Sequence, residues 1–191
     1  MAQIGFYYNQ KMCSGCKTCQ VACKDKNRLN VGTVLREVRS YTTGTYPNVN
    51  LYFYSATCNH CDTPACAEKC PVGAYEKRED GTVVQDPDKC IGCGTCIKAC
   101  PYGVPREDAE KGCTRKCDGC IELREAGYLP ACVEACPYRA LDFGDVDELR
   151  EKYGADLVTS LPAQGQGDTG PNTLINPRKI ALEDVGTAIM H

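Results

Sequence analysis

The cysteines of this chain constrain its fold more than any other feature. Seventeen of its 191 residues are cysteine, and sixteen of them fall into four groups of four, which leaves Cys113 over. The first and third groups share the spacing C-x2-C-x2-C-x3-C, the second has a longer middle spacer, and the fourth is split into two pairs. In chain order the groups are Cys13, Cys16, Cys19 and Cys23; Cys58, Cys61, Cys66 and Cys70; Cys90, Cys93, Cys96 and Cys100; and Cys117, Cys120, Cys132 and Cys136.

These spacings predict four 4Fe-4S clusters as the cofactors, with the sixteen cysteines as metal ligands. A 4Fe-4S cluster needs four soft thiolates around a compact inorganic core, and two-residue spacers let one tight loop present three of them. The first and third groups match the bacterial ferredoxin spacing ligand for ligand. Three groups end in Cys-Pro, where the proline closes the helical turn that carries the last cysteine.

Two other uses of cysteine fit less well. A disulfide scaffold is disfavoured by the odd cysteine count, by a length well above the short secreted class and by the repeated C-x2-C-x2-C-x3-C runs. Structural zinc would suit isolated C-x2-C pairs, but the third and fourth cysteines that follow so closely do not suit separated zinc knuckles.

Composition and charge exclude further classes. With no Trp and only three Phe, the chain has little material for an ordinary core, so metal centres are expected to replace part of it. The net charge is -3, and the basic segment 1–57 lacks the aromatic-basic motif of a nucleic-acid reader, so no nucleic acid is expected. No apolar run approaches the roughly 18 residues of a membrane helix, and the N-terminus lacks a signal pattern. We therefore expect no direct membrane span and no export signal.

The four groups predict an internal repeat of paired clusters. In two-cluster ferredoxins the last cysteine of each group binds the other cluster, so the groups must pair. The simplest arrangement is an α+β fold in which one ferredoxin-like two-cluster module (58–112) is inserted in another (1–57 plus 113–145). A short helix and an extended tail (146–191) follow, and the connections are rich in loops. The predicted ligand sets are Cys58, Cys61, Cys66 and Cys100; Cys90, Cys93, Cys96 and Cys70; Cys13, Cys16, Cys19 and Cys136; and Cys117, Cys120, Cys132 and Cys23. The inventory of sixteen is firmer than this pairing.

Local patterns predict several strands. Residues 4–8 and 49–56 are rich in Tyr, Phe, Val and Ile, and residues 140–144 follow the last Cys-Pro with a similar pattern. Between the second and third groups, residues 74–84 form two strand-like runs around Asp80-Gly81, which predicts a β-hairpin.

The C-terminal part predicts one helix and little else. Residues 146–153 are polar and charged, with Asp145 placed as N-cap and Gly154 as the helix end. Beyond the helix, residues 161–168 are interrupted by Gln, Gly and Pro, and residues 171–177 form an extended strip. Because this tail has little capacity to form its own core, we expect it to lie on a partner.

Three segments give the chain a resemblance to a known family. They are CNHCDTPACAEKCP (58–71), CIGCGTCIKACPYG (90–103) and KCDGC (116–120). Together with residues 77–81 and 140–144, they resemble the iron–sulfur subunits of molybdopterin oxidoreductases, most of all the dimethyl sulfoxide reductase type. The resemblance covers about residues 4–160.

The resemblance implies a place in a larger complex. It implies two ferredoxin-like modules with four clusters in a row, between a catalytic subunit that carries molybdenum (or tungsten) bis-pterin and a quinol-oxidising membrane anchor. It also implies membrane association through these partners and export in the folded state with the catalytic subunit, with a cytoplasmic location as the alternative. Some relatives hold a 3Fe-4S cluster where Trp replaces a cysteine of the third group. Here Cys93 and Cys96 are both present, so four 4Fe-4S clusters are expected.

The main hypothesis is a non-catalytic subunit that relays single electrons. The alternatives are a freestanding polyferredoxin, an iron–sulfur subunit for another substrate (polysulfide, thiosulfate, arsenate, formate or a hydroxyaromatic compound) and a purely structural scaffold. His60 lies between two ligands and is interpreted as a group beside a cluster or facing a partner, not as a ligand. Solvation or packing is the expected role of the other residues that adjoin ligands. These are Tyr102, Arg115, Lys116 and Arg139.

Overall fold

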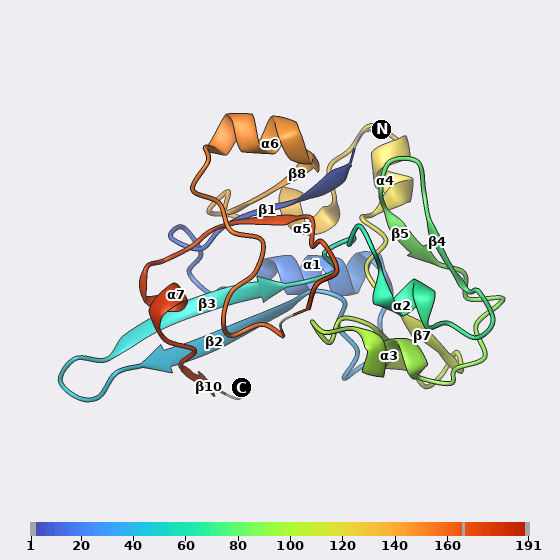
Figure 1. The fold of residues 1–191 in the computed structure, drawn as a ribbon, viewed down its shortest axis with the longest axis horizontal. Helices are drawn as coiled ribbons and strands as arrows, with labels where there is room; N and C mark the ends of the chain where they lie inside the picture. Colours follow the sequence, from blue (N-terminus) through green and yellow to red (C-terminus); the bar gives the residue numbers. More distant parts are fainter. Residues whose placement is uncertain (1–2, 166, 190–191) are drawn as a thin grey trace.

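The chain folds into small β-sheets, short helices and many loops, in agreement with the predicted α+β class (Figure 1). The structure is a computed structural model that describes residues 3–165 and 167–189. Residues 1–2, 166 and 190–191, which belong to the predicted outer module and tail, lie outside the described residues.

Short helices are interspersed with strands along the described residues. The strands are Ile4–Asn9 (β1), Glu37–Thr43 (β2), Asn50–Ala56 (β3), Tyr75–Lys77 (β4), Val83–Gln85 (β5), Arg106–Asp108 (β6), Cys113–Arg115 (β7), Leu141–Asp145 (β8), Thr173–Asn176 (β9) and Thr187–Ile189 (β10). The helices are Thr18–Lys26 (α1), Ala65–Glu68 (α2), Thr95–Ala99 (α3), Ile121–Glu125 (α4), Ala131–Glu134 (α5), Val146–Tyr153 (α6) and Ile180–Glu183 (α7).

Strand β1 is the centre of a three-stranded sheet of order β8-β1-β9. It runs antiparallel to β8, with Phe6 opposite Phe143, and parallel to β9, with Tyr8 opposite Ile175. The rings of Phe6 and Phe143 meet edge to face at 4.6 Å between centroids. The strands predicted at 4–8 and 140–144 are therefore confirmed, and their pairing joins the two ends of the predicted outer module.

The tail packs on its own chain, which differs from the expectation that it lies on a partner. Residues 173–176 form β9, and Leu174 and Ile175 have no exposed surface. Leu174 packs with Tyr7 on one face of the sheet, and Ile175 joins the larger core on the other. The physical reason is the open edge of β1, which offers backbone partners and apolar surface that the tail lacks by itself.

A second sheet carries a long hairpin. The predicted strand at 49–56 is confirmed as β3, which pairs antiparallel with β2, and β10 pairs with the other edge of β2. Figure 1 shows the β2–β3 hairpin extending beyond the rest of the molecule on the left. The stacked rings of Tyr41 and Tyr52, 5.1 Å apart, lie where β2 and β3 face each other.

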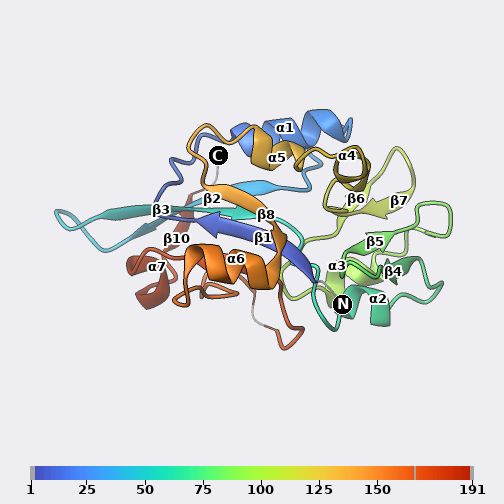
Figure 2. The same ribbon diagram turned by 90° about the horizontal axis from the view of Figure 1, so that it is seen from above.

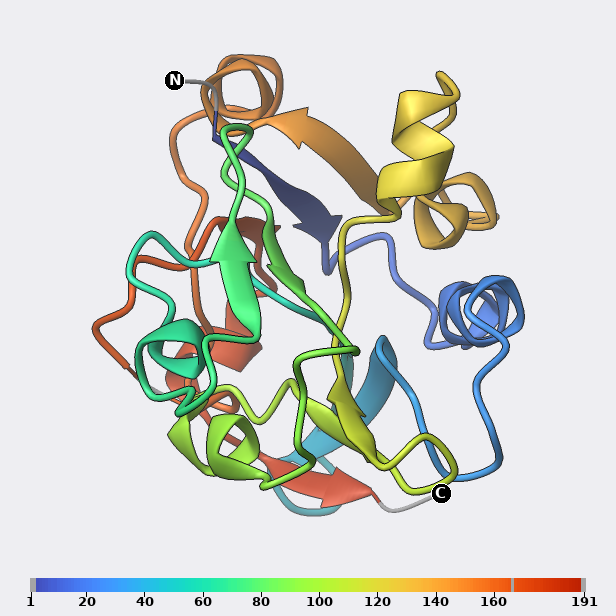
Figure 3. The ribbon, with the colours of Figure 1, turned by 90° about the vertical axis from the view of Figure 1, so that its right-hand side faces the viewer.

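The segment between residues 58 and 115 forms a separate region of small hairpins and one-turn helices, on the right in Figure 1 and facing the viewer in Figure 3. The predicted hairpin at 74–84 is confirmed as the antiparallel pair β4–β5. Gly81, with φ of +79°, occupies the left-handed position of its turn. A second hairpin, β6–β7, follows α3.

Helix α6 has the bounds that the sequence predicts, residues 146–153. The Asp145 side chain accepts hydrogen bonds from the backbone N–H groups of Asp147 and Glu148, which identifies it as the N-cap. Val146 and Leu149 turn inward toward β1 and β9. None of the helices in the described residues is both long and apolar enough to cross a membrane.

Candidate metal-cluster sites

Site A is a cavity of about 320 Å³ near the start of α1. Its loop turns at Gly15, which has φ of +74° and lies so close to the Phe53 ring that a Cβ atom would clash at 2.4 Å. Because only glycine fits there, the loop can hold its cysteines close together. Four cysteines line site A: Cys13, Cys16, Cys19 and Cys136.

Site B lies where α1 and α5 pack side by side (Figure 2). This packing brings Cys23, from the first group, to three cysteines of the fourth group. Burial raises the pKa of the Cys23 thiol, and the charges of its cysteine neighbours raise it further. All four thiols of site B are buried: Cys23, Cys117, Cys120 and Cys132.

Site C is the largest of these cavities, at about 370 Å³, and lies beside α2. Burial raises the pKa of Cys61 to about 11 and that of Cys66 to about 12. Protonated thiols at neutral pH must release their protons when a metal binds, so cluster binding here is linked to pH. The cysteines that line site C are Cys58, Cys61, Cys66 and Cys100.

Site D is a cavity of about 260 Å³ between α2 and α3. Cys93 is exposed, and hydrogen bonds from the side chain and backbone of Thr95 lower its pKa. Helix α3 begins just after Gly94, whose φ of +70° is the left-handed turn that starts it. The cysteines that line site D are Cys70, Cys90, Cys93 and Cys96.

Each site draws three cysteines from one group and the last cysteine from another. These four sets are the ones that the crossing of the terminal cysteines predicts. Cys113 belongs to none of them. It is buried in β7, where burial raises its pKa, and the next residue, Thr114, contacts Cys90 of site D.

The sites follow one another in the order A, B, C, D. Cys19 of site A and Cys132 of site B interact closely enough that the charge of Cys19 raises the pKa of Cys132, after the larger effect of burial. At Cys117 of site B, burial and, more weakly, the charge of Cys58 of site C raise the pKa, but the neighbouring His60 lowers it to below its ordinary value. Cys66 of site C and Cys96 of site D belong to one buried cluster. The sixteen thiols thus form a row across the molecule.

Backbone amides donate to the sulfur atoms at repeated positions. Ala74 N–H donates to Cys70 Sγ at 3.3 Å, and Ala140 N–H donates to Cys136 Sγ at the same distance. In both cases the donor lies four residues after the last cysteine of a group and past its Cys-Pro turn. Sulfur atoms surrounded by N–H donors are suited to carry the negative charge of cluster-bound thiolates.

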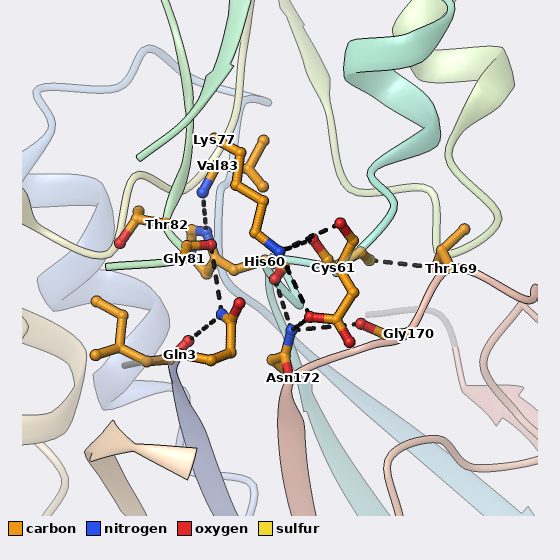
Figure 4. Close-up of polar contacts among 12 residues, drawn as sticks. Gln3, His60, Cys61, Lys77, Gly81, Thr82, Val83, Thr169, Gly170 and Asn172 are labelled. Atoms are coloured by element: carbon orange, nitrogen blue, oxygen red, sulfur yellow. Dashed lines mark hydrogen bonds and ion pairs between the residues drawn. The ribbon is translucent and has the colours of Figure 1, made fainter. Parts of the chain in front are cut away.

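Residues of the tail contact the loop of site C, and Figure 4 shows the hydrogen bonds of Thr169 and Asn172 to this loop. Thr169 donates its hydroxyl proton to Cys61 Sγ at 3.2 Å, and Tyr102 hydrogen-bonds that hydroxyl at 3.2 Å. Asn172 donates from its side chain to His60 O at 2.9 Å and to Asp62 Oδ1 at 3.0 Å. The tail therefore contributes both a donor to a predicted ligand and a cover for its loop.

Sequence reasoning did not single out Arg36 among the basic residues of segment 1–57, which it interpreted as balancing cluster charge or forming a solvated face. In the structure Arg36 lies between sites A and B. Its side chain is 1% exposed, and Nη1 donates to Ser55 Oγ at 3.0 Å. The guanidinium also lies over the Phe6 ring, 4.6 Å from its centroid. Burial lowers the pKa of Arg36, but the thiols of Cys132 and Cys19 raise it to well above its ordinary value. No cysteine spacing points to this residue, and its burial is a product of the tertiary fold.

Among the residues predicted to be solvated or packed, Lys116 differs from the others. Arg139 is exposed and donates to Glu134 O, and Arg115 pairs with Asp108, so both agree with that expectation. Lys116 is 7% exposed and donates from Nζ to Cys58 Sγ at 3.5 Å. His60 is 1% exposed, so it lies beside the cluster sites and does not face solvent.

Comparison with known proteins identifies 4Fe-4S domains in the same part of the chain as the cysteine groups. Residues 49–146 match the 4Fe-4S dicluster domain family, and residues 10–31 match the 4Fe-4S binding domain family. The protein is 47% identical over 183 residues to the B subunit of the anaerobic dimethyl sulfoxide reductase of Escherichia coli strain K12, an alignment that covers 92% of this protein and 89% of that relative. The chain belongs to this family of iron–sulfur subunits. Electron transfer through four 4Fe-4S clusters is accordingly its role.

Two further relatives support the same family. The B subunit of the anaerobic dimethyl sulfoxide reductase of Haemophilus influenzae strain Rd is 44% identical over 190 residues, covering 95% of this protein and 92% of the relative. Protein NrfC of Escherichia coli strain K12 is 40% identical over 149 residues, covering 76% of this protein and 67% of the relative. Both alignments cover more than two thirds of this protein.

Proposed function

We propose that sites A to D each hold one 4Fe-4S cluster through the four cysteines that surround it. The observation that carries this assignment is the gathering of the sixteen grouped cysteines into four sets, while Cys113 stays outside them. When bound, each cluster accepts and releases one electron. The residues of this chain hold the thiolates, donate hydrogen bonds to the sulfur atoms and keep water from the inner sites.

Cysteine substitutions test the ligand assignment. Cys19→Ser and Cys23→Ser change two cysteines of the same group, but the crossing places them in sites A and B. We expect the two variants to alter different cluster signals in electron paramagnetic resonance spectra. Cys113→Ser is the matched control and should retain the iron content and spectrum of the wild type. If Cys19→Ser and Cys23→Ser alter the same signal, the crossing is wrong.

We infer that electrons enter and leave at the two ends of the row. Site A contains the exposed Cys16 and site D contains the exposed Cys93, whereas every thiol of site B is buried. A partner that docks at either end would come close to a cluster. The inner sites would then carry electrons between the two surfaces.

The proposed partners are a molybdopterin catalytic subunit at one end and a membrane anchor at the other. This proposal rests on the family, whose relatives are named as components of dimethyl sulfoxide reductase. The protein would then be a non-catalytic subunit, associated with a membrane through its partners and exported in the folded state with the catalytic subunit. The substrate would bind to the molybdenum (or tungsten) bis-pterin of the catalytic subunit.

Co-purification tests the partner assignment. The affinity-tagged protein should isolate a large molybdenum-containing subunit, and its reduced clusters should be reoxidised when dimethyl sulfoxide is added to the complex. A protein that purifies alone from its native cells and exchanges electrons only with small soluble proteins would favour the freestanding polyferredoxin. If polysulfide, thiosulfate or arsenate reoxidises the clusters and dimethyl sulfoxide does not, the electron-transfer role would stand and the substrate would be a different one.

A further inference from the structure

Sites B and C meet at a junction formed by two buried side chains, His60 and Lys116. His60 lies in the loop of site C, between Cys58 and Cys61. Lys116 immediately precedes Cys117 of site B. Each side chain therefore belongs to the loop of one site, and Lys116 also contacts a thiol of the other.

Lys116 extends from the loop of site B to site C. Its ammonium group donates to Cys58 Sγ at 3.5 Å, to Cys117 O at 2.9 Å and to Val83 O. An ammonium group has three protons, so these contacts use all of its donors. The positive charge is thus held in a fixed position against a thiol of site C, in a place that is 7% exposed.

His60 extends in the opposite direction. Its Nδ1 accepts a hydrogen bond from Val83 N–H at 3.1 Å, so a neutral ring carries its proton on Nε2. Nε2 is buried and has no hydrogen-bond partner among the described residues. Burial lowers the pKa of His60, and the facing Cys117 thiol of site B partly reverses that effect. The ring therefore has one buried N–H donor that no described residue satisfies, next to the loop of site C. A cluster-bound thiolate would give this donor an acceptor.

The backbone of one residue holds both side chains. Val83 lies in β5 and is 1% exposed, and its N–H binds His60 while its C=O accepts from Lys116. Figure 4 shows His60 beside Val83 and the neighbouring turn. Because β5 belongs to a hairpin, neither side chain can shift without breaking a buried hydrogen bond. The junction is consequently pre-organised.

We propose that His60 and Lys116 are positioning residues that couple site B to site C, each donating to a thiolate of the site in the other loop. The inference rests on the proposed ligand assignment. In the step that they assist, one electron passes between the two sites, so one site is oxidised and the other is reduced. No bond to carbon, nitrogen or hydrogen changes, and no proton moves.

The physical effect is on the reduction potentials of both sites. A fixed positive charge and N–H donors stabilise the additional negative charge of a reduced site. Because Lys116 precedes a ligand of site B and contacts a ligand of site C, its charge acts on both. The reduction potentials of sites B and C should therefore rise together. Their difference then stays small, so the free-energy change of electron transfer between the two sites also stays small.

Substitution of Lys116 tests the proposal in the intact complex, with potentials measured by redox titration and electron paramagnetic resonance. Lys116→Met should lower the ratio of reduced to oxidised cluster at sites B and C about tenfold at a fixed solution potential, a shift of about 59 mV for a one-electron couple. Sites A and D should change less than about twofold, since their ligands do not contact Lys116. Lys116→Arg keeps the charge and should restore most of the shift.

The sequence offers a matched control in Lys89, which precedes Cys90 of site D as Lys116 precedes Cys117. The Lys89 side chain is 64% exposed and pairs with Asp86. Solvent screens such a charge, so Lys89→Met should change every ratio less than about twofold. A comparable shift in this control would show that any lysine beside a ligand has the effect, and the junction would lose its special role.

The proposal is overturned if Lys116→Met leaves all four potentials unchanged, shifts all four equally, or shifts them in a way that Lys116→Arg does not reverse. If Lys116→Met fails to retain its clusters, two variants of His60 test the proposal instead. His60→Gln retains an acceptor and a donor, whereas His60→Phe has neither, so the Phe variant should lower the potential of site B relative to Gln. Equal potentials of site B in the two His60 variants would refute the proposed role of the junction. A wild-type protein without four cluster signals would instead refute the proposed ligand assignment.

Discussion

Removal of the Arg36 charge should lower the reduction potentials of sites A and B. Arg36 Nη1 lies 3.0 Å from Ser55 Oγ, which lies 3.5 Å from Cys19 Sγ, so the guanidinium is at most about 6.5 Å from this sulfur. At an effective dielectric constant of about 20, two unit charges at that distance interact by about 2.5 kcal/mol. For a one-electron couple this energy corresponds to about 110 mV.

That value is the upper end of the expected shift. An added electron spreads over the whole cluster, so its mean distance from Arg36 exceeds the distance to the thiolate. We therefore expect Arg36→Met to lower the potential of site A by about 50–110 mV, and that of site B by a comparable amount because Arg36 also interacts with Cys132.

Redox titration of the complex, followed by electron paramagnetic resonance, measures the shift directly. Arg36→Lys keeps the charge and should recover part of the potential, although it loses the planar contact with the Phe6 ring. Arg139→Met removes an exposed arginine three residues after Cys136 and serves as the control, with an expected shift below about 20 mV because solvent screens the charge. Equal shifts in Arg36→Met and Arg139→Met would refute the reasoning.

Three predictions concern the stability of the β8-β1-β9 sheet and of helix α6, measured by denaturant unfolding of the cluster-loaded protein. Ile175→Ala removes a fully buried side chain of β9 and should cost about 2–5 kcal/mol, whereas a loss below about 1 kcal/mol would mean that the tail does not pack on β1. Asp145→Ala removes the N-cap of α6 and should cost about 1 kcal/mol, and an unchanged unfolding midpoint would contradict that role. Burial raises the pKa of Asp142, but hydrogen bonds from Lys152 and Tyr153 bring it below its ordinary value. The ionised carboxylate therefore stabilises the fold above about pH 4, and this contribution is lost as the pH falls through the lowered pKa. Asp142→Asn should be less stable than the wild type at pH 7 and should approach it near pH 3, so a constant difference across this range would argue against the account.

Local signals in the sequence are sufficient for elements that depend on neighbours in the chain. The sequence predicts helix α6 with its observed bounds because its N-cap and its terminal Gly154 lie next to it. It predicts the hairpin β4–β5 because the turn, Asp80-Gly81, stands between the two strands. The grouping of the cysteines into four sets also follows from short spacers and a known ferredoxin rule.

Features that depend on distant segments are not predictable in the same way. The parallel pairing of β1 with β9 joins the two ends of the chain, and no local pattern encodes that register. Arg36 has an ordinary basic context in the sequence, and its burial against Phe6 of β1 and Ser55 of β3 is a product of the tertiary fold. Lys116 and His60 adjoin ligands in the sequence, but the contact of Lys116 with the neighbouring site depends on how the loops of sites B and C pack together.

The central claim is that sixteen thiols hold four clusters, and the iron and sulfide content of the purified protein tests it most directly. With four ligands for each 4Fe-4S cluster, the account predicts about 16 iron and about 16 sulfide per molecule, unchanged in Cys113→Ser. A content near 8 of each in the undamaged protein would mean that only two sites are filled, and it would contradict a row of four.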